Sequence, residues 1–174
     1  TSLSEQGKHD EAKRILGRLL ARNDVKSKEA IRHKIADILR AAGDFDKSID
    51  AYRKMLRSDP NRICCFEHIG DIYKAQDRNE MAERMYRNVE TGYERLIRTS
   101  GKNSRPYIIA FVKFLVEQER SIEHASELAK AHLKIKPEDP QMLVLLARCM
   151  EQSGDYIEAL AALGKAQESR PAWT

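Results

Sequence analysis

The stretch FEHIGDIY, residues 66–73, returns with the same spacing as RHKIADIL at residues 32–39 and as LVLLARCM at residues 143–150. In each copy, apolar or small residues recur three and four positions apart, with a basic residue in the first place of the copy at 32–39. Such spacing places them on one face of a helix, because one helical turn takes 3.6 residues. The repetition therefore predicts several copies of one helical unit.

A tight turn and a second apolar series follow each copy. The turns are Gly43-Asp44-Phe45, Asp77-Arg78-Asn79 and Gly154-Asp155-Tyr156, and the second series are Ser48/Tyr52/Met55, Ala82/Tyr86/Val89 and Ala159/Leu163/Ala166. Gly43 and Gly154 can take the left-handed conformation that ends a helix, and the aspartate after each can cap the next helix. The turns from Gly7 onward are 36, 34, 43 and 34 residues apart, so the unit is a helix, a turn and a helix.

On these residues the chain resembles the tetratricopeptide repeat family. In that family, small residues such as Ala36, Gly70 and Ala147 lie where the first and second helices of a repeat approach closely. The resemblance extends to the alanines that begin the second-helix seams and to the prolines that close repeats, Ala82, Ala125, Ala159, Pro60, Pro137 and Pro171. It implies an all-α fold, a right-handed superhelical solenoid of antiparallel helix pairs with about nine helices. It also implies a binding protein rather than an enzyme.

The repeat length divides the chain into five spans. We expect a half repeat at 1–26, a repeat at 27–61, a repeat with an extended second helix and a loop at 62–105, a repeat at 106–138, and a repeat with the start of a following unit at 139–174. Apolar residues from Val89 to Ile97 suggest that the second helix of the third span runs about two turns further, up to the breaker at 99–104. The chain thus reads as a segment of a longer array.

Two positions depart from the family pattern. Arg32 stands where the family favours an aromatic residue, and Lys113 falls at the usually small crossing position of the repeat at 106–138. A one-residue slip would place apolar residues on the seam instead, namely Ile108, Phe111, Val112 and Leu115. The register of this helix therefore stays open between the two alternatives.

Composition excludes several classes of protein. No apolar run reaches the roughly 18 residues that a membrane helix needs, and no basic and apolar leader stands at the N-terminus. The three cysteines are an odd number, and two of them are adjacent, which favours a reducing compartment and a cytoplasmic protein. The net charge of +4 is too small to imply nucleic acid by itself.

Candidate chemistry is sparse. Cys64 and Cys65 precede His68 on one predicted helix, so a metal half-site or a thiol–imidazole pair is conceivable. However, residues equivalent to Cys65 and Cys149 in other repeats are apolar, which indicates packing positions. His33 and Asp37 can pair across one helical turn, and we expect no more than a surface pair. We therefore expect no catalytic residue, no cofactor and no metal.

The first helices of a superhelix line its concave side, so residues half a turn from the seam should face a groove. The expected groove residues are His33, Asp37, Arg40, Cys64, Glu67, Asp71, Lys74, Tyr107, Phe114, Val144 and Arg148. The middle of this stripe is acidic with flanking basic residues, and its later part is apolar. Such a lining suits a protein or peptide partner with basic and apolar side chains.

Other functions remain open. Basic residues concentrate at 84–105, which would suit an RNA-binding repeat, although Tyr93 is the only aromatic residue of that segment beyond Tyr86 near its start. A purely architectural segment of a larger assembly is a further alternative. The basic excess between Lys8 and Lys34 and the acidic excess from Glu138 onward also suggest end-to-end self-association of the fragment.

Overall fold

A computed structural model describes residues 28–168 and, before them, residues 7, 10–12, 14, 15, 17, 18 and 21. Within these residues the regular elements are all helices, and no strand occurs. The chain forms two compact units, Thr1–Gly92 and Tyr93–Thr174. The all-α prediction is confirmed for the described part, whereas the half repeat expected at 1–26 falls largely outside it.

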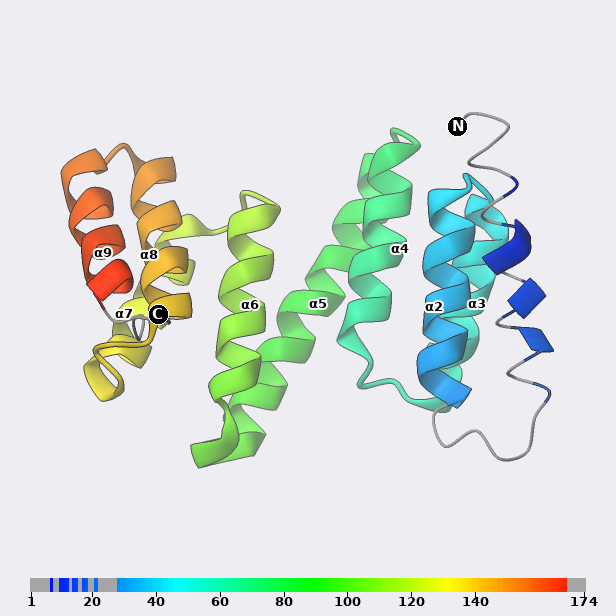
Figure 1. Cartoon of the computed structure of the whole chain (residues 1–174), viewed down its shortest axis with the longest axis horizontal. Helices are drawn as coiled ribbons and strands as arrows, with labels where there is room; N and C mark the ends of the chain where they lie inside the picture. The colour runs from blue at the N-terminus through cyan, green and yellow to red at the C-terminus, as the bar shows by residue number, and fades with distance from the viewer. Residues whose placement is uncertain are drawn as a thin grey trace, which may run out of the picture. The chain divides into compact units, whose positions relative to one another are not determined.

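The helices follow one another with short connections (Figure 1). The first unit holds α2 (Lys28–Ala41), α3 (Phe45–Ser58), α4 (Ile63–Ala75) and most of α5 (Asn79–Ser100). The second unit holds the end of α5, a short 3₁₀ helix η1 (Gly101–Asn103), α6 (Arg105–Glu117), α7 (Ile122–Ile135), α8 (Pro140–Ser153) and α9 (Tyr156–Glu168). No described helix is both long and apolar enough to cross a membrane.

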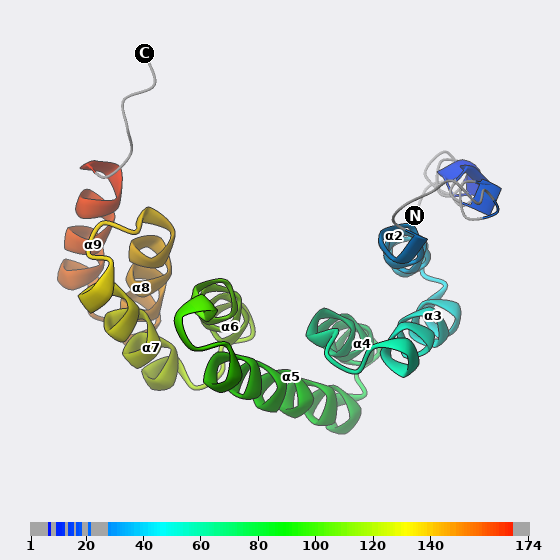
Figure 2. The ribbon, with the colours of Figure 1, turned by 90° about the horizontal axis from the view of Figure 1, so that it is seen from below.

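Within each unit the helices form antiparallel pairs arranged in two rows. In the first unit α2 and α4 form one row and α3 and α5 the other; in the second unit α6 and α8 form one row and α7 and α9 the other (Figure 2). In the second unit α6 packs against α8 as well as against α7. The first helices of neighbouring pairs therefore lie side by side inside each unit, as expected for stacked repeats.

The turn residues behave largely as the sequence predicts. Gly43 and Gly154 have φ values of 82° and 85°, the left-handed conformation that suits glycine. Asp139 caps α8, because its side chain accepts a hydrogen bond from the Met142 backbone N–H at 3.4 Å. The prediction for Asp44 is wrong in one respect: it stands at the N-cap of α3 but makes no side-chain capping bond, and its carboxylate lies 3.5 Å from Lys47 Nζ instead.

Small residues lie where helices cross. Ala36 and Ala147 are buried, and a Cβ placed on Gly70 would lie 2.5 Å from Cε1 of Tyr86 on α5. A second crossing of this kind, which the repeat pattern does not reveal, involves Gly92, where a Cβ would lie 2.9 Å from Cγ1 of Ile63. Since real Cβ contacts do not approach so closely, any larger residue at either position would force the facing side chain or the two helices to shift.

Helix α5 is long, as its apolar residues predict. It has 22 residues, against 14 for α3, and ends at Ser100. Its C-terminal part belongs to the second unit, where Tyr93 stacks on Phe111 of α6 with ring centroids 5.5 Å apart. The breaker segment begins slightly later than expected, with Thr99 and Ser100 still helical and residues 101–103 forming η1.

The register of α6 follows the one-residue slip. The Lys113 side chain is 57% exposed and lies 3.8 Å from Glu117, so it does not occupy a helix crossing. Phe111, Val112 and Leu115 are buried, and they form the packing face of α6 together with Ile109, Phe114 and Val116. A lysine ammonium is too costly to bury without a partner, so the helix is rotated until Lys113 reaches water.

Candidate functional site

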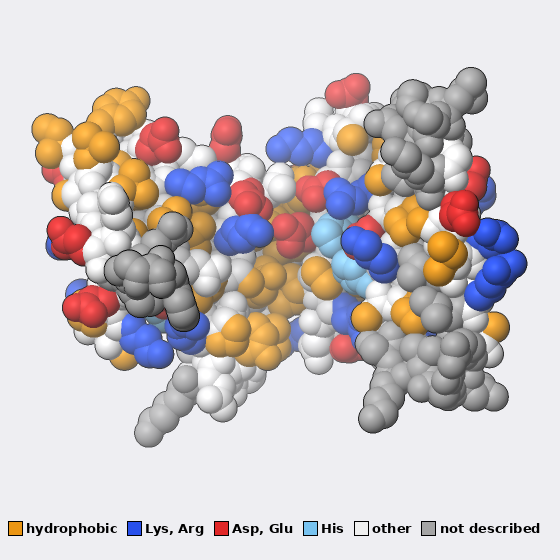
Figure 3. Space-filling model, in the orientation of Figure 1, with side chains coloured by type: hydrophobic (Ala, Val, Ile, Leu, Met, Phe, Trp, Pro, Cys, Tyr) orange, Lys and Arg blue, Asp and Glu red, His pale blue; other side chains and the backbone are white. Residues whose placement is uncertain are grey.

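The first unit gathers most of the expected groove residues on one face. The α2–α4 face consists of His33, Asp37 and Arg40 from α2 and of Cys64, Glu67, Asp71 and Lys74 from α4. Lys74 is exposed, and the other six are partly exposed. Figure 3 shows histidine side chains on this part of the surface, with basic and acidic side chains around them. The structure thus places these seven side chains on neighbouring helices, where solvent can reach them.

Two hydrogen bonds of the same kind support the carboxylates of this face. Tyr52 donates its hydroxyl to Asp37 Oδ1 at 2.6 Å, and Tyr86 donates its hydroxyl to Asp71 Oδ1 at 2.9 Å. In both cases a buried tyrosine of a second helix reaches an aspartate 15 positions earlier in the chain. The repeat therefore duplicates a polar contact as well as an apolar seam, and it fixes two carboxylates on the α2–α4 face.

Two imidazoles lie close to the Asp37 carboxylate. Its Oδ2 lies 3.3 Å from His33 Nδ1, and its Oδ1 lies 3.9 Å from His68 Nε2. Partial burial by itself would raise the pKa of Asp37, but the hydrogen bond from Tyr52 and the two imidazoles outweigh it and lower the pKa. Burial, together with the same phenol bond, raises the pKa of Tyr52. Asp37 is therefore a carboxylate and Tyr52 a neutral donor at neutral pH.

A weaker contact links the two helices of the face. Arg40 of α2 approaches Asp71 of α4, with Nη1 and Oδ2 4.0 Å apart. Burial, and after it the nearby Arg40 guanidinium, lowers the pKa of His68. His68 Nδ1 is buried without a hydrogen-bond partner. His68 therefore stays uncharged at neutral pH.

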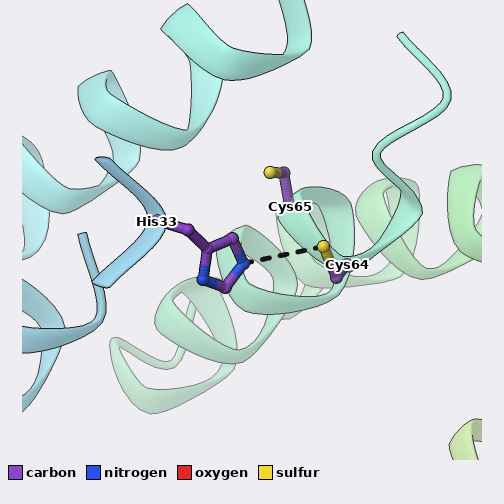
Figure 4. Close-up of side chains that lie close together, drawn as sticks. All are labelled: His33, Cys64 and Cys65. Carbon is purple, nitrogen blue, oxygen red and sulfur yellow. Dashed lines mark hydrogen bonds between the residues drawn. The ribbon is translucent and has the colours of Figure 1, made fainter. Parts of the chain in front are cut away.

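Cys64 faces an imidazole. Its Sγ lies 3.6 Å from Nε2 of His33, which extends from α2 toward the start of α4 (Figure 4). The neighbouring Cys65 thiol lowers the pKa of Cys64 to about 6 against the effect of burial, and His33 and Arg62 add to this. Cys65 is fully buried, and its pKa is raised by the neighbouring Cys64 and by burial.

Two sets of donors in this region could hold a metal ion. They are His33 with Cys64 and Cys65, and His33 with Asp37 and His68, and the ligand atoms in each set lie within 4.8 Å of one another. The sequence paired the two cysteines with His68 alone, because those residues share a helix. His33 was missed as their neighbour, because its approach to Cys64 depends on how α2 packs beside α4.

The second unit follows the groove prediction only in part. Tyr107 is half-buried, Val144 is 37% exposed and Arg148 is exposed. Phe114 is only 1% exposed, so its assignment to an open groove is wrong. The slip in α6 explains this: it brings Lys113 to the surface and turns Phe114 into the packing face.

Asp139 forms a buried cluster that the sequence did not predict. Its Oδ2 accepts hydrogen bonds from Arg105 Nη2 at 2.7 Å and from Nε at 3.0 Å, and it lies 2.8 Å from His132 Nε2. His132 and Asp139 are both buried. Burial opposes ionisation, but the bonds from Arg105 and His132 and the backbone bond from Met142 lower the pKa of Asp139. The cluster connects α6, α7 and the cap of α8, which indicates a structural role.

The basic segment at 84–105 is partly neutralised. Arg105 is paired with Asp139, and Arg87 Nε lies 3.5 Å from Glu83 on the same helix. Its aromatic residues are Tyr86, bonded to Asp71, and Tyr93, stacked on Phe111. Neither ring offers an open platform for a nucleotide base.

Sequence comparison identifies one family. The sequence model of the tetratricopeptide repeat family matches residues 1–63 and 119–172, which together exceed half of the chain. The unmatched residues 64–118 include the long helix α5 and the shifted helix α6. No curated protein matches the sequence.

Solved structures resemble the fold at low identity. BtubC from P. vanneervenii superposes with a TM-score of 0.58 at 18% identity, over 96% of this chain and 75% of that chain. A putative kinesin light chain of Podosopora anserina gives 0.58 at 20% identity, over 94% and 87%. A tetratricopeptide repeat protein of Parabacteroides merdae gives 0.57 at 13% identity, over 98% and 63%. At these identities the likeness concerns the fold, which is that of a helical-repeat solenoid.

Proposed function

Because the chain belongs to the tetratricopeptide repeat family, whose members generally mediate protein–protein interaction, we propose that it is a scaffold that binds a partner through the α2–α4 face. Proteins of this family are generally non-catalytic, so the function expected of this chain's surface is to bind a partner. We further propose that it is a segment of a larger cytoplasmic adaptor or complex subunit. The proposed repeat boundaries are those expected from the sequence.

The duplicated tyrosine–aspartate bond carries this proposal. Tyr52 and Tyr86 each occupy one oxygen of a carboxylate, while the aspartate side chains remain 26% and 30% exposed. A carboxylate that is already oriented loses little freedom when it binds, so it recognises a cation more effectively than a mobile surface acid. The repeat offers two of them, Asp37 and Asp71, on neighbouring helices.

The surrounding residues support a particular class of partner. Glu67 adds a third acid one helical turn before Asp71 on α4, and Arg40 and Lys74 are basic residues of the same face. Such a surface favours an extended or helical peptide that presents lysine or arginine toward the acids and apolar side chains beside them. We propose this partner class for the first unit. Tyr107, Val144 and Arg148 offer a separate and more apolar surface in the second unit.

Selection from a displayed peptide library tests the proposal. Peptides would be selected on the full chain and then measured against the double variant E67K/D71N, in which the amide that replaces the Asp71 carboxylate can still accept the Tyr86 hydroxyl. The control D46K/D50K adds positive charge on exposed positions of α3, in the other row of helices. We expect the selected peptides to be basic and apolar, to bind E67K/D71N at least tenfold more weakly, and to bind the control as they bind the wild type. Equal affinity for both variants, with unchanged helicity, would refute the proposed face.

A further inference from the structure

Cys64 differs from the other two cysteines in its surroundings. Cys65 and Cys149 are fully buried, whereas Cys64 is partly exposed. Cys64 is also the second residue of α4, a helix of 13 residues. The unpaired backbone N–H groups of a first helical turn favour a negative charge, so a thiolate is more stable there than in a helix interior. Cys64 is therefore the described thiol with both solvent access and a favourable position.

Cys64 is the first member of a series of contacts that includes His33 and Asp37 of α2 and Tyr52 of α3. The Cys64 Sγ lies 3.6 Å from His33 Nε2, and the other ring nitrogen of His33 lies 3.3 Å from Asp37 Oδ2. Asp37 is in turn held by the Tyr52 hydroxyl at 2.6 Å. A thiol, an imidazole that can take its proton and a carboxylate that orients the imidazole form the arrangement that activates a cysteine nucleophile.

The groups around the thiol favour its ionised form. Arg62 lies at the N-cap of α4, and its guanidinium also contacts Glu29, 3.4 Å away. The titratable and charged groups that face this cluster are Glu29, His33, Asp37 and Arg40 of α2, Tyr52 of α3, Asp59 and Arg62 before α4, and Cys65, His68 and Asp71 of α4. Of these, Cys65, His33 and Arg62 are the groups that lower the pKa of Cys64.

We propose that Cys64 is a thiol-modification site, in which His33, oriented by Asp37, activates the sulfur toward low-molecular-weight disulfides. The thiol proton passes to His33 Nε2, and the Cys64 sulfur attacks one sulfur of the disulfide. The disulfide bond of the reagent breaks, a new bond forms between Cys64 and one half of it, and the other half leaves as a thiolate. The protein thiol is oxidised and the reagent is reduced by the same electron pair.

The observations favour a reactive thiol over a metal centre at this cluster. The third donor of the sulfur-containing set, Cys65, is fully buried, and its pKa is raised, so it does not supply a second thiolate. Arg62 places a positive charge beside the sulfur, which assists a thiolate and opposes a cation.

The test is the pH profile of modification of the full chain by hydroxyethyl disulfide, with the modified residue found by peptide mass mapping. An ordinary cysteine has a pKa of about 8.5, so its rate falls steeply between about pH 8 and pH 6. Cys64 should keep most of its rate to about pH 6 and react there roughly tenfold faster than an ordinary thiol, after allowing for the weaker nucleophilicity of a low-pKa thiolate.

Matched variants separate the proposal from simple exposure. H33Q should lower the rate at pH 6 about fivefold and move the profile toward that of an ordinary cysteine. H124Q, which changes a half-buried histidine of α7, should leave both unchanged. C64S should abolish the adduct and C149S should not. Three results would overturn the proposal: an adduct on Cys65 or Cys149 instead, a profile that H33Q does not move, or complete protection of Cys64 by one equivalent of Zn²⁺, which would make the cluster a metal centre.

Discussion

The α2–α3 and α8–α9 pairs have the same helix crossing but different polar chemistry. Ala36 and Ala147 are the buried small residues of the two crossings. In the earlier pair, Asp37 follows Ala36 and is bonded to Tyr52. In the later pair, Arg148 takes the position of Asp37 and Leu163 that of Tyr52, and both are exposed. The apolar seam is therefore common to the two pairs, and among the described pairs the tyrosine-bonded aspartates belong to the first unit.

The buried acid of the second unit serves a different purpose from those of the first. Asp139 is bonded to Arg105 and His132 and caps α8, while Asp37 and Asp71 remain accessible. A buried carboxylate stabilises the fold but is unavailable to a partner, whereas a partly exposed carboxylate can stabilise the fold and also bind a partner. This contrast predicts that mutation of Asp139 will mainly lower stability and that mutation of Asp71 will mainly weaken binding.

The largest loss of stability is expected for Asp139→Ala. The change removes the α8 cap and leaves His132 buried without its partner, so it should lower the free energy of unfolding by about 3 kcal/mol. Arg105 is half-exposed, and water can solvate its unpaired charge, which limits the loss. Urea unfolding followed by circular dichroism measures the change in the free energy of unfolding. A loss below about 1 kcal/mol would show that the cluster is not a structural element.

The second-largest loss of stability is expected for Gly70→Leu. The added side chain collides with the Tyr86 ring, so overpacking should cost roughly 1–3 kcal/mol. Gly164→Ala on α9 is the matched control, because a Cβ there meets no atom within 4 Å, and it should be stabilising by about 0.5–1 kcal/mol. A Gly70→Leu variant that melts like the wild type would mean that α4 and α5 do not cross at this residue.

A smaller effect is expected for the tyrosine hydroxyls. Tyr86→Phe should lower stability by about 1 kcal/mol, since a hydrogen bond to a partly exposed carboxylate is lost. A double-mutant cycle of Tyr86→Phe with Asp71→Ala should give a coupling of similar size. The same cycle with Leu163→Phe and Arg148→Ala in the later pair should give none. Equal coupling in both pairs would remove the contrast between the units.

The smallest effect concerns acid stability. The pKa of Asp139 is lowered in the folded chain below the unfolded value of about 3.9. Its contribution is therefore complete above that value and is lost as the pH falls through the folded pKa. Asp139→Asn should flatten the dependence of stability on pH below about pH 4 and leave its shape unchanged near neutrality. An unchanged acid limb in thermal melts between about pH 2 and pH 5 would contradict the assigned ionisation.

The sequence predicted the helices well because apolar periodicity and turn residues are local signals. Gly43 and Gly154 end helices through their own backbone conformation, so their roles can be predicted from neighbouring residues. The length of α5 followed similarly from the apolar residues beyond Val89. The repeat boundaries themselves stay a prediction.

The side-chain clusters were less predictable, because they depend on packing between helices. Tyr52 and Tyr86 were assigned to the apolar seam, and their hydroxyl bonds were missed. The recurrence of a tyrosine 15 residues after an aspartate in two successive repeats was the signal that could have revealed them. The contact of His33 with Cys64 joins two repeats and has no such recurrence. Phe114 was misplaced because the prediction used the average repeat spacing. In the structure α6 is rotated so that Lys113 reaches water, and this rotation buries Phe114.

The α2–α4 face is tested most directly by chemical-shift mapping of the isotopically labelled chain with a peptide from the library selection. We expect amide shifts concentrated on α2 and α4, around Asp37, Glu67 and Asp71, with α3 and α9 unaffected and with the shifts lost in E67K/D71N. Shifts confined to α8 and α9, or spread over α3 while E67K/D71N binds as the wild type does, would contradict the claim that the α2–α4 face is the binding surface.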